Sequence, residues 1–109
     1  MSVGLYKYDG DIYNRSSELV LSENIASQEF YEKYWERAIH ELNIKYIQDG
    51  AEFDLSKKSI VLEELELLLS WTEKNLQGKN REYMSDGIEN LKKVIPDALN
   101  NEKTILYIF

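Results

Sequence analysis

The stretch that most constrains the fold lies near the middle of the chain, where residues 60–76 read IVLEELELLLSWTEKNL. Its apolar residues follow the 3.6-residue period of an α-helix and occupy an arc of about 220°, whereas a helix packed on one side needs an apolar stripe of about 100°. The sequence therefore predicts a helix over 60–76 that is covered on two sides, by the rest of the chain or by a partner. Ser59 or Ser56 is a candidate N-cap, and Gly78 is expected just after the end of the helix.

Glu64 falls inside this apolar arc, which leaves three interpretations open. In the first, the helix is packed between a sheet and another helix, and Glu64 reaches outward at a seam or accepts a hydrogen bond from a loop amide. In the second, the helix turns a second apolar face toward a partner, made of Ile60, Glu64, Leu67 and Trp71. On such a face Trp71 would be an anchor, and Glu64 would bind an incoming Arg or Lys. In the third, Glu64 is a catalytic acid or base.

The N-terminal residues predict a β-hairpin. Strand-prone residues flank an Asp-Gly pair at 9–10, which is typical of a two-residue type I′ turn, so we expect strands over 3–8 and 11–15. Residues 18–24 fit either a third strand or a lead-in to the first helix.

Two further helices are predicted from amphipathic periodicity. The first covers 27–42, and Ser27 is its candidate N-cap. The second covers NREYMSDGIENLKKVI, residues 80–95, but an internal glycine leaves open a later start at Asp86. Pro96 is expected to end or kink this helix, because proline has no backbone N–H to donate.

The remaining apolar runs complete a small α+β domain. Residues 44–47 predict a short strand, and the C-terminal run KTILYIF, residues 103–109, predicts a central strand buried on both faces. We therefore expect one domain over 1–109, in which three main helices pack on a short, mostly antiparallel sheet with an N-terminal hairpin and a C-terminal strand.

Composition and missing motifs exclude several classes of function. Cysteine is absent and histidine occurs once, which excludes disulfides and thiolate chemistry and disfavours zinc sites and a Ser-His-Asp triad. Glycine-rich phosphate loops and the common hydrolase motifs are missing. No apolar run approaches the roughly 20 residues that span a bilayer, and no signal peptide is visible. We expect a cytoplasmic protein without cofactor, metal ion, membrane contact or catalytic activity.

The charge balance points to a basic partner. Acidic residues outnumber basic ones by 20 to 13, for a net charge of −7, which disfavours direct nucleic-acid binding because phosphates require a basic face. An acidic surface speeds encounter with a basic protein, although it also serves solubility alone. Acidic residues gather before and within the 60–76 helix. The predicted partner-binding residues are Asp49, Glu52, Asp54, Glu63, Glu64 and Glu66, with Trp71 and Tyr8 as aromatic anchors.

Taken whole, the chain resembles the small bacterial immunity proteins of contact-dependent growth inhibition and other polymorphic toxin systems. The resemblance rests on length, acidity, absent cysteine and the blocks YEKYWERAIHEL, IQDGAEFD and LEELELLLSWTEKN. It implies a non-catalytic inhibitor of a cognate toxin domain, most readily an RNase or DNase with a basic substrate groove. Because immunity families share no single fold, the resemblance assigns no residue roles.

Two other functions stay open at this point. One is a structural or regulatory module that forms a homodimer through Ile60, Leu67 and Trp71, and the oligomeric state is left undetermined by the sequence. The other is an enzyme that uses carboxylates, for which Glu64 is the first residue to test.

Overall fold

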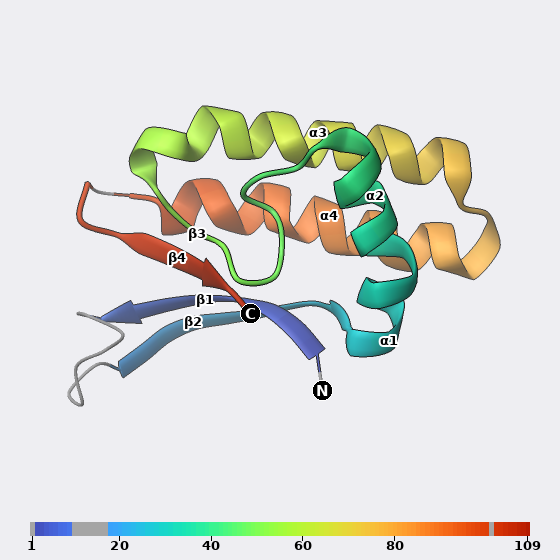
Figure 1. Cartoon of the computed structure of the whole chain (residues 1–109). Coiled ribbons are helices and arrows are strands. Elements are labelled where there is room, and N and C mark those ends of the chain that lie inside the picture. The colour runs from blue at the N-terminus through green and yellow to red at the C-terminus, as the bar shows by residue number, and fades with distance from the viewer. Residues whose placement is uncertain (1, 10–17, 101) are drawn as a thin grey trace.

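In the described part of the chain, the helices lie on one face of a four-stranded antiparallel sheet (Figure 1). The computed structural model describes residues 2–9, 18–100 and 102–109. Its strands follow the order β2-β1-β4-β3, and all neighbouring pairs are antiparallel. They are β1 (Ser2–Asp9), β2 (Glu18–Ser27), β3 (Glu52–Asp54) and β4 (Ile105–Ile108). The predicted α+β fold, with three main helices on an antiparallel sheet, is confirmed.

The first main helix is continuous but changes its winding in the middle. It consists of α1 (Gln28–Phe30), the π-helical η1 (Tyr31–Trp35) and α2 (Glu36–Leu42). The predicted N-cap is confirmed, because the Ser27 hydroxyl oxygen accepts a hydrogen bond from the Phe30 N–H at 3.2 Å. The helix ends at Asn43, whose φ of 56° is the left-handed conformation that commonly follows a helix.

The second main helix, α3 (Lys58–Asn75), confirms the prediction for 60–76 but begins differently. The cap is neither Ser59 nor Ser56. Instead the Asp54 carboxylate accepts a hydrogen bond from the Ser56 N–H at 3.0 Å and caps the short 3₁₀ helix η2 (Leu55–Lys57) that leads into α3. The wide apolar arc of α3 is covered mainly from within the chain, by α4 and α2.

The third main helix, α4 (Gly78–Ala98), is longer than either predicted version. Gly78, expected after the end of α3, is the first residue of α4. Gly87 does not interrupt the helix. A Cβ atom added there would lie 3.1 Å from the Ile25 carbonyl oxygen, so the glycine allows α4 to pack closely against β2. Pro96 lies inside the helix, which continues for two more residues. Within the described residues, no helix is both long and apolar enough to cross a membrane.

The strand predictions are corrected at two places. The strand expected over 44–47 is wrong: this segment is irregular, and the sheet is completed instead by β3. In the N-terminal hairpin, the partner of β1 is β2 over 18–27, the stretch for which the sequence left strand and lead-in both open. The second strand expected over 11–15 lies outside the described residues. The two-residue turn expected at 9–10 is wrong, because Asp9 is the last residue of β1 and pairs with Glu18.

The two faces of the sheet differ in what covers them. The face beneath the helices is buried and carries Val3, Leu5, Phe53, Leu106 and Ile108. The prediction that β4 is central is confirmed, since it lies between β1 and β3. The prediction that both of its faces are buried is wrong. Its outward side chains remain partly exposed, with Ile105 at 40% and Phe109, just beyond the strand, at 47%, because the helices pack on the other face (Figure 1).

Substitution of Ser27 tests the cap that starts the first helix. We expect Ser27→Ala to lower the free energy of unfolding by about 1 kcal/mol, because the Phe30 N–H loses its acceptor. Ser59→Ala is the matched control, since Ser59 is exposed in the first turn of α3 and is not its N-cap. Urea unfolding should show a change of no more than about 0.5 kcal/mol for the control. Equal losses in the two variants would contradict the assignment.

Candidate partner-binding surface

The carboxylate of Glu64 points into the protein and is fully engaged there. Glu64 is only 7% exposed. Its two oxygens accept hydrogen bonds from three consecutive backbone N–H groups, those of Lys45 at 2.7 Å, Tyr46 at 3.0 Å and Ile47 at 3.1 Å. This confirms the structural interpretation, in which Glu64 binds loop amides. It also explains why 44–47 is not a strand, because these N–H groups are held by a side chain rather than by a neighbouring strand.

The segment held by Glu64 leads to the edge of the sheet. Farther along, the Asp49 N–H donates a hydrogen bond to the Tyr31 hydroxyl oxygen at 2.7 Å. Burial raises the pKa of Tyr31 above its ordinary value, so the hydroxyl stays neutral. The Gly50 N–H then donates to the Ile108 carbonyl at 2.7 Å, and the Ile108 N–H donates to the Ala51 carbonyl at 2.9 Å. These bonds place the following residues, which form β3, alongside β4.

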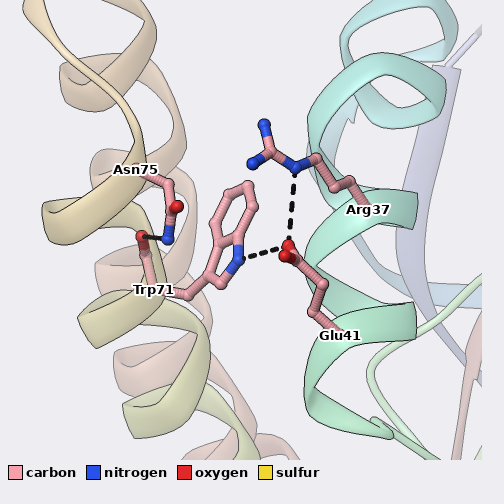
Figure 2. A network of polar contacts seen from close by, with 4 residues as sticks. All are labelled: Arg37, Glu41, Trp71 and Asn75. Carbon is pink, nitrogen blue, oxygen red and sulfur yellow. Dashed lines mark hydrogen bonds and ion pairs between the residues drawn. The ribbon is translucent and has the colours of Figure 1, made fainter.

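The Trp71 side chain points from α3 toward Arg37 and Glu41 of α2 (Figure 2). It is 6% exposed, and its indole N–H donates a hydrogen bond to the Glu41 carboxylate at 2.8 Å. The Arg37 guanidinium lies 5.5 Å from the ring centre and pairs with the same carboxylate at 3.4 Å. The ring is therefore covered by α2. The role of Trp71 as a partner anchor stays a prediction.

The predicted partner-binding acids other than Glu64 fall into two groups, and all of them are exposed except Asp54, which is half-buried. Glu52 and Asp54 stand two residues apart on β3, opposite Tyr107 and Ile105 of β4, so both carboxylates belong to the outer face of the sheet. Asp49 precedes them in the loop. Glu63 and Glu66 are exposed on α3 instead, and Glu66 pairs there with Lys92 of α4. The hydrogen bond from this pair raises the pKa of Lys92.

Tyr8 shares the outer face with the first acidic group. Its ring meets that of Tyr107 edge-on, with the ring centres 6.1 Å apart. Tyr107 lies directly opposite Glu52 on β3 and opposite Tyr6 on β1. We call this surface the open sheet face. It is defined by Tyr6, Tyr8, Glu52, Asp54, Ile105, Tyr107 and Phe109.

Four members of the open sheet face were not predicted. They are Tyr6, Ile105, Tyr107 and Phe109. The period-2 alternation of a strand, applied to 105–109, would have placed three of them on one face. The interpretation of this strand as buried on both sides concealed that pattern.

Asp54 is held in its charged form. The hydroxyl and backbone N–H of Ser56 donate hydrogen bonds to its carboxylate. These bonds, chiefly the one from the hydroxyl, lower the pKa of Asp54 below its ordinary value. The carboxylate is therefore negative at neutral pH and in mild acid, as a surface for a basic partner requires.

Neither a metal site in the described residues nor a known relative indicates the function. In the described ranges, no three His, Asp or Glu side chains are grouped so that they could hold a metal ion. No protein-family model, curated protein or solved structure matches the chain. The resemblance to immunity proteins therefore stays a prediction.

Substitution of Glu64 tests whether this side chain organises the 43–51 segment. We expect Glu64→Ala to lower the free energy of unfolding by about 3 kcal/mol, because hydrogen bonds to a charged acceptor are lost and buried N–H groups are left unpaired. Glu64→Gln keeps one acceptor oxygen and should lose less.

The control is Glu63→Ala on the exposed side of α3, which should change stability by no more than about 0.5 kcal/mol. Urea unfolding at neutral pH measures all three variants. A Glu64→Ala protein as stable as the control would rule out this role.

Proposed function

We propose that the protein is an immunity protein that binds a cognate basic toxin domain in the cytoplasm and neutralises it without catalysis of its own. The observation that carries the proposal is the open sheet face of a strongly acidic chain. There Glu52 and Asp54 stand beside aromatic side chains. Carboxylates next to aromatic rings suit a protein partner that presents arginine or lysine.

A nuclease is the toxin class that best fits this chemistry. RNases and DNases bind the phosphates of their substrate through basic side chains. A protein of net charge −7 competes for those side chains by offering carboxylates in place of phosphates. The same charge speeds the encounter between inhibitor and toxin. A small acidic protein of this kind inhibits the nuclease by occupying its substrate groove.

A second candidate function is a homodimeric structural or regulatory module. It is favoured by Ile60 and Leu67, which are 41% and 45% exposed on α3 and lie seven residues apart, hence on one side of the helix. Trp71, the third member of the predicted face, is covered by α2. Sedimentation equilibrium distinguishes this candidate. A mass that stays monomeric as concentration rises argues against the dimer.

The proposed function is tested with the cognate toxin domain, which the proposal expects to be a basic domain encoded next to the gene. We would purify that domain, measure its binding to the full chain by calorimetry and measure its nuclease activity with increasing amounts of the chain. We expect inhibition to be complete near a one-to-one ratio. A nuclease that remains fully active under saturating amounts of the chain would contradict the proposal.

The acidic residues of the sheet edge should contribute most of the charge interaction. We expect Glu52→Gln and Asp54→Asn each to weaken toxin binding about 30-fold, as for residues near the centre of an interface. Asparagine remains a good cap, so Asp54→Asn removes charge while the start of η2 is retained.

The matched control is the pair Glu63→Gln and Glu66→Gln, which removes the same charge from α3. Equal effects of the two pairs would show that only net charge matters. A larger effect of the control pair would place the contact on the helical side.

A further inference from the structure

We propose that the open sheet face binds an arginine-rich segment of the partner, with guanidinium groups stacked on the aromatic rings and paired with Glu52 and Asp54. The inference rests on the proposed function, because it takes the partner to be a basic protein. It adds the place of contact and the side chain that is recognised.

The aromatic rings of the open sheet face form two contacting pairs over the two central strands. Tyr6 stacks on Phe109, with ring centres 4.5 Å apart and an angle of 29° between the planes. Tyr8 meets Tyr107 edge-on at 6.1 Å. Because Tyr6 and Tyr107 are directly opposite in the β1–β4 register, the two pairs are adjacent. Four rings thus cover neighbouring positions of one sheet face.

Gly4 allows the Tyr6 ring to lie along the strand. A Cβ atom added at Gly4 would come within 2.8 Å of the Tyr6 hydroxyl oxygen and 3.0 Å of the ring carbon that carries it. The ring therefore occupies the space above Gly4 instead of standing away from the sheet. Of this stacked pair, Tyr6 is half-buried and Phe109 is 47% exposed, so the Phe109 ring is the more open of the two to a planar group such as a guanidinium.

The carboxylates at the edge of this surface select among partners. Glu52 stands opposite Tyr107 and Asp54 opposite Ile105, on the same outer face as the rings. Lys7 of β1 turns to the other face, where its ammonium donates a hydrogen bond to the Ala98 carbonyl at 3.1 Å. Lys57 lines the same hollow as Glu52 and Asp54, so one cation stands there against two carboxylates. A nucleic acid would bring phosphates against this net negative charge, and a second copy of the chain would bring its own acidic residues.

Arginine fits these groups better than lysine does. A guanidinium stacks on an aromatic face and at the same time donates paired hydrogen bonds to a carboxylate, whereas an ammonium is a compact and strongly hydrated point charge. The open sheet face offers both kinds of group side by side, at Tyr107 and Glu52. We therefore expect recognition of arginine rather than of positive charge in general.

The test uses the full chain with two peptides of equal length, oligo-arginine and oligo-lysine, followed by NMR and calorimetry. We expect oligo-arginine to shift the ring resonances of Tyr8, Tyr107 and Phe109 and to bind at least about fivefold more tightly than oligo-lysine. In Tyr8→Leu/Phe109→Leu, the apolar bulk stays while the rings are gone, and this preference should disappear.

Two controls separate binding from folding, because cross-strand aromatic pairs also stabilise a sheet. Ile60→Ala/Leu67→Ala removes exposed apolar side chains from α3 and should keep the preference for arginine. Phe109→Leu alone removes one ring of the Tyr6–Phe109 pair. It should reduce the preference for arginine, and it provides the test if the double variant does not fold.

Several results would overturn the inference. The first is that the peptide shifts only resonances of α3 and α4. The second is that the two peptides bind with equal affinity, or that the preference for arginine survives loss of the rings. The third is that this face binds an oligouridine RNA or mediates self-association. The inference and the proposed function fail separately. Toxin binding that is unaffected by Tyr8→Leu/Phe109→Leu overturns the inference alone, whereas a chain that binds arginine but no toxin overturns the function alone.

Discussion

Three backbone hydrogen bonds to one buried carboxylate determine the layout of this protein. Glu64 holds the N–H groups of residues 45–47, and the chain that leaves this turn pairs with the end of β4. Only then does β3 reach the edge of the sheet with Glu52 and Asp54 on its outer side. A charge inside an apolar helix face is costly unless it is fully hydrogen-bonded, and here that requirement fixes the path of the loop.

The helices pack on one face of the sheet and do not cover its outer face. Antiparallel sheets commonly pack on one side and face water on the other. In this protein the water side carries aromatic rings along β1 and β4 and carboxylates along β3, while Trp71 is covered by α2. We therefore propose the sheet, rather than the 60–76 helix that the sequence pattern favoured, as the place of partner contact.

The sequence was informative where local periodicity decides the structure. The helix over 27–42, its cap at Ser27 and the helix over 60–76 follow from side-chain spacing, and all are confirmed. The central place of the last strand is also confirmed, although it was predicted from a near-continuous apolar run whose expected burial on both faces is wrong. The strand expected over 44–47 failed because its N–H groups bond to a side chain 17 to 19 positions away. A hydrogen-bond acceptor so far away in the sequence cannot be recognised from a local sequence pattern.

The candidate site was predicted only in part, for a related reason. Tyr8, Glu52 and Asp54 were named from composition and position, and the structure brings them to one face. Their neighbours Tyr6 and Phe109 were missed, because the contact joins the two ends of the chain and depends on strand order. Whether a strand face is open depends on where all of the helices pack, which the pattern of the strand alone does not contain.

The central claim is that a basic partner binds on the open sheet face. Hydroxyl-radical footprinting of the full chain, alone and with the toxin domain, tests it most directly, because aromatic side chains are readily oxidised where solvent reaches them. The account predicts lower oxidation of Tyr8, Tyr107 and Phe109 in the complex and unchanged oxidation of Tyr83, which is 40% exposed on α4. Protection of Tyr83 with no change on the open sheet face would contradict it.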